Sequence, residues 1–118
     1  MDLTIFFSPL DESIYSNITS SSSFYKSIRF FGEKMPNYKD SHIALIGVTE
    51  NRGAGNNTGT SKAADEIRKK LYALKKGSGK YRIVDLGNLK PGHDLQETYT
   101  RISEVCRILL ENNVLPII

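Results

Sequence analysis

The segments HIALIGV, residues 42–48, and TENRGAGNNTG, residues 49–59, decide which fold this chain can adopt. An unbroken apolar run such as the first is typical of a strand that is buried on both faces of a parallel sheet. After the glycine-rich second segment, residues 61–76 carry one apolar helical face, made of Ala63, Ala64, Ile67, Leu71 and Leu74. The pattern predicts a strand, a loop and a helix.

The remainder of the chain repeats this alternation. Residues 81–86 and residues 114–118 are two further strand-like runs. Between them, Asp94 with Glu97 three positions later is similar to a capping box that opens a helix. The apolar residues of that helix recur at helical spacing: Leu95, Tyr99, Ile102, Val105, Cys106, Leu109 and Leu110. Helical crossovers between strands predict an α/β fold of three layers, α/β/α, around a parallel sheet with strand order 2-1-3.

The N-terminal region, residues 1–42, lacks this regularity. A serine N-cap before a proline, at residues 8–9, predicts a short helix, and residues 19–23 form a Ser-rich connector. The aromatic side chains of residues 24–31 are too apolar for a free linker, so we expect them to pack on the main body. We divide the chain into this N-terminal extension and an α/β unit, residues 43–118.

The third predicted strand is apolar and closes the sequence. Native sheets usually avoid such a bare edge. On this ground we expect the chain to be the N-terminal fragment of a longer α/β protein, with a 118-residue protein as the alternative. An exposed edge can also pair with another chain, which leaves a homo-oligomer open.

The composition fits one small globular domain. Of 118 residues, 39% are hydrophobic and 25% are charged, and the net charge is +3. No apolar run approaches the ~20 residues of a membrane span, and no secretory signal is visible. The single cysteine, Cys106, is expected to be a buried thiol in a reducing compartment, so we predict a cytoplasmic protein. The lysines of residues 62–76 lack interleaved aromatic side chains, which argues against nucleic-acid binding.

The glycine loop matches neither common phosphate-binding pattern. Its G-x-G-x-x-x-G spacing is one residue longer than the dinucleotide fingerprint, and Thr60-Ser61-Lys62 reverses the Lys-Ser/Thr order of a P-loop. We expect a glycine-permissive loop at the carboxyl end of a strand, where open α/β sheets place ligands. Among the acids, Asp85 lies near the carboxyl end of the second predicted strand, as a site residue or a structural hydrogen-bonding group.

Three segments match, in order and spacing, a known pattern of strands and loops. They are Ile46-Gly47-Val48 with Gly53, Asn57, Gly59, Ile67-Arg68 and Leu71; then Val84-Asp85-Leu86-Gly87-Asn88-Leu89; and last Asn113-Val114-Leu115-Pro116-Ile117-Ile118. Together they resemble the ureohydrolases, the family of arginase, agmatinase and formiminoglutamase. The resemblance covers residues 43–118. In place of the Gly-Pro that the family usually has before the helix stands Ala63-Ala64.

The resemblance implies a hydrolase that splits a C–N bond of a small guanidino or formimino substrate. In that family two manganese ions activate a bridging hydroxide. Their ligands belong to G-G-x-H, D-x-H-x-D and D-x-D-x-x-D segments, and none of these occurs in the 118 residues. The chain alone is therefore expected to be inactive and to hold no metal, with no catalytic residue assigned. By position, the residues most able to touch a substrate at the pocket rim are Arg52, Asn56 and Asn57.

Two other classes of function stay open beside the hydrolase. One is a nucleotide-binding module of the Rossmann or flavodoxin kind, which a nucleotide would stabilise against heat. The other is a non-catalytic interaction domain that pairs through its third strand. For none of these three classes of function do we expect a membrane or a nucleic acid as a partner.

Overall fold

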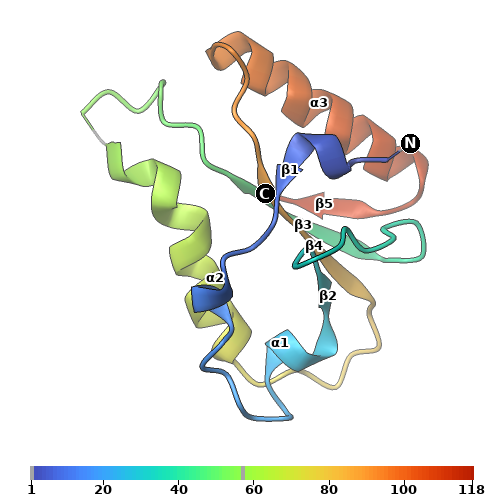
Figure 1. The fold of residues 1–118 in the computed structure, drawn as a ribbon. Helices are drawn as coiled ribbons and strands as arrows, with labels where there is room; N and C mark the ends of the chain where they lie inside the picture. The colour runs from blue at the N-terminus through green and yellow to red at the C-terminus, as the bar shows by residue number, and fades with distance from the viewer. Residues whose placement is uncertain (1, 57) are drawn as a thin grey trace.

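The computed structural model describes residues 2–56 and 58–118 (Figure 1). Its elements, with η for a 3-10 helix, are in chain order η1 (Thr4–Phe6), β1 (Phe7–Ser8), η2 (Glu12–Ile14), α1 (Phe24–Ser27), β2 (Arg29–Phe30), β3 (Ile43–Val48), η3 (Thr58–Lys62), α2 (Ala63–Ala73), β4 (Ile83–Leu89), α3 (Leu95–Glu111) and β5 (Leu115–Ile117). The predicted α/β class is confirmed. Within the described ranges, no helix is both long and apolar enough to cross a membrane.

The strands form one mixed sheet. β1, β4, β3 and β5 lie side by side in that order, and β2 also pairs with β4. β3 runs parallel to β4 and to β5, whereas β1 runs antiparallel to β4. The sheet is thus mixed, and the predicted parallel sheet with strand order 2-1-3 is not confirmed. The reason is that β2 and β1 share the open edge of β4, β2 beside Val84 and Asp85 and β1 beside Asn88 and Leu89.

The N-terminal region belongs to this sheet and its core. Ser8 lies in β1 opposite Asn88, so it does not cap a helix. In place of the predicted short helix the chain forms η2, which Asp11 caps by accepting a hydrogen bond from the backbone N–H of Ser13. Residues from before the predicted division at residue 42 enter the main core: Leu3, Phe7, Phe31 and Tyr38. Both parts of the chain therefore share the main core, and both also contribute to a second cluster, made of Leu10, Ile14, Ile28 and Tyr72.

The face of the sheet that α3 covers is apolar. Successive strand residues point to opposite faces, and this face receives Ala44 and Ile46 from β3 and Val84 and Leu86 from β4. From α3 it receives Val105, Ile108 and Leu109. The predicted helix start is confirmed, because the Asp94 carboxylate accepts a hydrogen bond from the Glu97 backbone N–H at 2.8 Å. The predicted apolar stripe is shifted, since Tyr99 and Leu110 are more than half exposed.

On the opposite face, α2 docks through a buried polar group and through an apolar cluster that Tyr72 forms with Leu10, Ile14 and Ile28. It buries Arg68 and Tyr72, whereas Ile67 and Leu74 are 64% and 59% exposed. The predicted apolar face is thus wrong by about one residue, or roughly 100° around the helix. The physical reason is Asp85, a fully buried carboxylate on this face of β4, which requires a cation beside it.

The free edge of β5 lacks a donor at its centre. The Leu115 N–H donates to the His42 carbonyl at 2.9 Å, so Leu115 faces β3. Alternate residues of a parallel strand bond to the same neighbour, so Pro116 faces away from β3. Proline has no N–H, and a proline in this position blunts an edge strand. A strand that pairs with this edge would therefore lack one hydrogen bond, at Pro116.

Candidate functional site

The loops that follow β3 and β4 meet at the carboxyl edge of these two parallel strands. β3 ends at Val48 and leads into residues 49–57, and β4 ends at Leu89 and leads into residues 90–94, which open α3. This is the edge at which open α/β sheets place ligands. The glycine-rich segment is a turn-rich loop, in which Gly55 has a φ of 61°.

Glu50 and Arg52 clamp the two loops together. Glu50 has a side chain only 7% exposed, and it accepts hydrogen bonds from the Arg52 guanidinium at 2.6–3.1 Å and from the Thr98 hydroxyl at 2.7 Å. The side-chain and backbone hydrogen bonds from Arg52 hold the pKa of the Glu50 carboxyl at about 2. Thr98 also accepts the Gly92 N–H at 2.8 Å, so the clamp reaches the first turn of α3. We call Glu50, Arg52 and Thr98 the rim clamp.

The rim clamp uses most of the Arg52 guanidinium. Its Nη1 donates to the His93 carbonyl and its Nη2 to the Gly92 carbonyl, both at 2.8 Å, while Nε and Nη2 serve Glu50. Since a guanidinium has five N–H groups, one on Nη1 has no partner within residues 2–56 and 58–118, and the side chain is 40% exposed. Asn56 is exposed in the same loop, and Asn57 lies outside the described residues. Of the predicted rim residues, Arg52 therefore has a fixed position.

Below this rim, Asp85 is the centre of a second polar group. The Arg68 guanidinium donates to both Asp85 oxygens at 2.9 Å, and the Tyr72 hydroxyl donates to Asp85 at 2.6 Å. The remaining Arg68 donors reach Asp65, Asn88 and the Gly87 carbonyl. We call Asp85, Arg68 and Tyr72 the buried triad. All its polar atoms have partners, so it holds α2 on β4 and offers no group to a ligand.

The charges of the buried triad reinforce one another. Burial alone lowers the pKa of Arg68, but the hydrogen bonds and charge of Asp85 outweigh it and the pKa is raised. Burial, and then the adjacent Asp85 carboxylate, raise the pKa of the Tyr72 hydroxyl. Arg68 and Tyr72 therefore both stay protonated as donors to Asp85. The sequence leaves two roles open for Asp85, as a site residue or as a structural group. This geometry fits the structural role.

Two glycines allow the strands to approach this centre. A Cβ at Gly47 would lie 1.9 Å from the Asn88 side-chain oxygen and 2.8 Å from Arg68 Nη1. Gly87 has a φ of 88°, and a Cβ there would lie 2.3 Å from the Ser8 carbonyl oxygen. Glycine is thus required at both positions, at Gly47 by its contacts with β4 and α2 and at Gly87 by its contact with β1.

The described residues do not form a metal centre. In residues 2–56 and 58–118 no three His, Cys, Asp or Glu side chains come together as a group able to hold an ion. Two acids whose side chains are at most 7% exposed, Glu50 and Asp85, are bound to arginines. Asp85 is the third of the seven residues of β4, so it lies farther from the carboxyl end than the sequence predicts. Cys106 is half-buried on α3, and burial raises the pKa of its thiol. The donor set of this part of the chain therefore does not fit a pair of manganese ions.

Sequence reasoning missed the partners of the residues that it selected. Arg68 lies within the resemblance segments, but its spacing gives no sign that it is buried. Glu50 and Thr98 are 48 positions apart and meet only because β3 and α3 are neighbours. A short-range signal exists for Glu50 alone, since Glu50 and Arg52 form a local pair of opposite charges.

Comparison of the chain with protein-family models, with curated proteins and with solved structures finds no match.

Proposed function

We propose that this chain forms the N-terminal α/β part of a ureohydrolase-like enzyme, which cleaves a C–N bond in a small guanidino or formimino compound. One observation supports the proposal. The three segments of the resemblance lie in neighbouring strands, β4, β3 and β5, and the first two send their loops to the same edge. In the proposed enzyme the order of these strands is the 2-1-3 start of a doubly wound sheet.

In this proposal the rim clamp positions the substrate. A guanidino amino acid has a carboxylate at one end, which requires donors. The free N–H of Arg52 and the amide of Asn56 are donors of the right kind, and Asn57 is the third residue assigned to this role. The clamp to Gly92 and His93 fixes the Arg52 side chain before substrate arrives, which lowers the entropic cost of binding.

The chemistry that breaks the bond is not assigned to the described residues. They lack a manganese ligand set, so the proposal takes the metal chemistry to belong to the family's ligand segments elsewhere in the enzyme. The role of this chain is to bind and orient the substrate and to build the sheet on which the pocket stands.

The first test is the coding frame downstream of Ile118, followed by assay of the native polypeptide. We expect G-G-x-H, D-x-H-x-D and D-x-D-x-x-D segments and manganese-dependent release of urea from arginine or agmatine, or of formamide from formiminoglutamate. A frame without these segments, together with no turnover of the three compounds, would overturn the proposal.

A variant pair tests the rim residues in that assay. Arg52→Lys keeps a positive charge but loses the planar fork, so KM should rise about tenfold with little change in kcat. Lys34→Ala is the matched control, because Lys34 is an exposed basic residue that takes no part in the rim clamp. Equal kinetics for both variants would remove Arg52 from the substrate site.

A further inference from the structure

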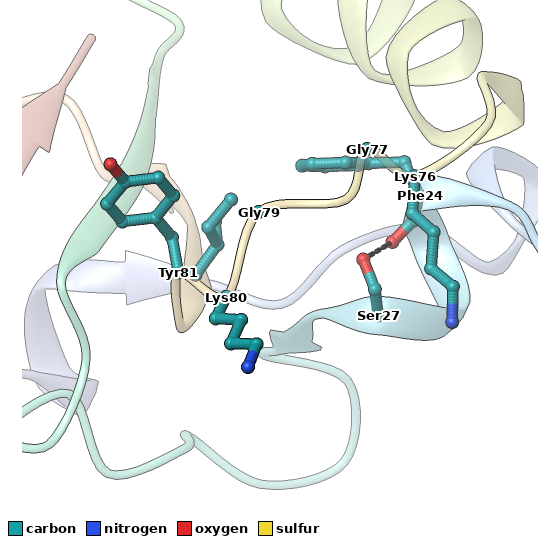
Figure 2. Close-up of a pocket in the computed structure, with 8 residues that line it drawn as sticks. Phe24, Ser27, Lys76, Gly77, Gly79, Lys80 and Tyr81 are labelled. Atoms are coloured by element: carbon teal, nitrogen blue, oxygen red, sulfur yellow. Dashed lines mark hydrogen bonds between the residues drawn. The ribbon is translucent and has the colours of Figure 1, made fainter.

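A hollow lies at the end of the sheet opposite the rim clamp, beside the amino end of β4. Its volume is about 600 Å³, and its walls come from α1 and from the loop between α2 and β4 (Figure 2). We call it the amino-end hollow; its lining residues are Phe24, Ser27, Lys76, Gly77, Gly79, Lys80, Tyr81 and Ile83. This volume lies in the range of pockets that bind small molecules.

The amino-end hollow carries unneutralised positive charge. Lys76 and Lys80 line it, and in the view of Figure 2 their ammonium groups lie on either side of Ser27. In the part of the chain that the structure describes, no acidic residue lines this hollow, and neither lysine makes an ion pair. Two like charges on one concave wall repel each other, and an anion between them relieves that repulsion.

The other walls are flat and partly apolar. The Phe24 ring is half-buried, and the Tyr81 ring is 69% exposed but packs edge-on against His42, with 5.8 Å between ring centroids. Ser27 donates its hydroxyl hydrogen to the Phe24 carbonyl at 2.7 Å, so its oxygen faces a ligand only as an acceptor. Aromatic rings bind other flat rings by stacking, at sites where a base or similar heterocycle can lie on them.

Backbone hydrogen bonds hold the two walls together. The Phe24 N–H donates to the Leu74 carbonyl at 2.6 Å, and the Lys76 N–H donates to the Ser22 carbonyl at 2.9 Å. Ser23 and Lys75 form an isolated antiparallel bridge between these contacts. The segment that carries Lys76 is therefore fixed to α1 before any ligand enters.

We propose that the amino-end hollow binds a nucleoside monophosphate or a ligand of the same chemistry, with a phosphate on a flat heterocycle. The phosphate lies between Lys76 and Lys80, and the heterocycle lies against Tyr81, the more exposed of the two rings. A single-stranded nucleic acid is the less suitable occupant, because it requires a groove that follows several phosphates in succession. This site is separate from the carboxyl-edge site and does not depend on the proposed hydrolase activity.

Calorimetric titration of the chain with AMP, adenosine and inorganic phosphate tests the proposal. We expect AMP to bind about tenfold or more tightly than either part alone, since each part makes only one kind of contact. Lys80→Glu and Lys76→Glu should each weaken AMP binding about tenfold or more. Lys34→Glu makes the same charge change outside the hollow and should weaken binding about twofold at most, through net charge alone.

A second pair of variants tests the aromatic wall. Tyr81→Ala should weaken AMP binding about fivefold and leave phosphate binding unchanged. Tyr99→Ala is the control, because Tyr99 is also an exposed tyrosine, 53% accessible, but lies on α3. Thermal melts test whether each variant is folded. If Lys80→Glu is not folded, Lys80→Gln takes its place.

Three results would overturn the proposal. They are no AMP binding at millimolar concentration, AMP binding that the lysine variants leave unchanged, and equal binding of adenosine and AMP. A fourth is oligouridine that binds more tightly than AMP and depends on the same lysines, because it would assign the hollow to single-stranded RNA.

Discussion

The two faces of the sheet hold their helices by different interactions. α3 packs on one face through apolar side chains such as Val105 and Leu109, which are at most 1% exposed. α2 packs on the other face through the buried carboxylate of Asp85, which Arg68 and Tyr72 reach. It also packs through an apolar cluster that Tyr72 forms with Leu10, Ile14 and Ile28. Ile67, the neighbour of Arg68, is 64% exposed and contributes little to the contact.

This difference shows how two helices in similar crossovers can depend on unlike forces. Apolar packing is non-directional and grows with buried area, so it is spread over many residues. A buried ion pair is directional and concentrated, and removal of one partner leaves the other charged and without compensation. A single substitution in the Arg68–Asp85 pair should therefore destabilise the α2 contact strongly. A comparable loss at the α3 contact should require several substitutions.

Asp85→Ala should have the largest effect. It leaves the Arg68 guanidinium buried with no carboxylate, which costs about 3–5 kcal/mol of unfolding free energy. Urea unfolding followed by circular dichroism measures the loss. Glu66→Ala is the control, since it breaks the exposed pair with Lys69 and should cost less than about 1 kcal/mol. Similar losses for the two variants would mean that burial adds nothing to the Arg68–Asp85 pair.

A double variant sharpens this result. Arg68→Met with Asp85→Leu removes both charges and keeps apolar volume, so it should recover most of the stability that Asp85→Ala loses. Loss beyond that of the single variant would indicate that the pair is required for the packing of α2 itself.

Leu109→Ala should have the next largest effect. Leu109 is a fully buried residue of α3, and truncation leaves a cavity that costs about 2–4 kcal/mol. The neighbouring Leu110 is 57% exposed, so Leu110→Ala should change the unfolding free energy by about 0.5 kcal/mol or less. The same urea titration compares them, and an equal cost at both positions would contradict the assigned α3 face.

The rim clamp should make a smaller, pH-dependent contribution. The pKa of Glu50 falls from 4.5 to about 2 on folding, so its stabilising effect is complete above pH 4.5 and is lost as the pH falls through about 2. Glu50→Gln should lower Tm near neutral pH and make the decline of Tm below pH 4.5 shallower. Glu33→Gln, at an exposed carboxylate, should leave both unchanged. If Tm falls with pH in the same way for Glu50→Gln and for the wild-type chain, the rim clamp is excluded as a source of stability.

Ile67→Gln should have the smallest effect. On the predicted helix Ile67 belongs to the apolar face, but its exposure places it outside the packed contact. A polar residue there should change the unfolding free energy by about 0.5 kcal/mol or less, by the same urea titration. A loss above 2 kcal/mol would restore the predicted face and contradict the comparison between the two helices.

The same contrast explains how much of the fold was predictable. α3 follows from a cap at Asp94 and an apolar stripe, which are both local signals. The α2 contact depends on Arg68 and Asp85, which are 17 positions apart, and helical periodicity assigns a charged side chain to solvent. β1 has two residues and no periodicity, so neither its existence nor its antiparallel direction was visible.

The candidate site was predictable in place but not in detail. The loop after β3 contains Arg52, as predicted from its position at the end of an apolar run. The groups that fix Arg52 are the carbonyls of Gly92 and His93. Every residue has a backbone carbonyl, so no sequence pattern distinguishes these two.

The pairing of β1 with β4 determines when the fold can be completed. Phe7 lies opposite Leu89, so β1 has no neighbour until most of the chain has left the ribosome. Contacts between such distant residues close late and slow folding. We expect the parallel strands to assemble first around β3, with Leu3 and Phe7 uncovered until β4 emerges. During synthesis, the N-terminal residues are then the ones most exposed to chaperones and to aggregation.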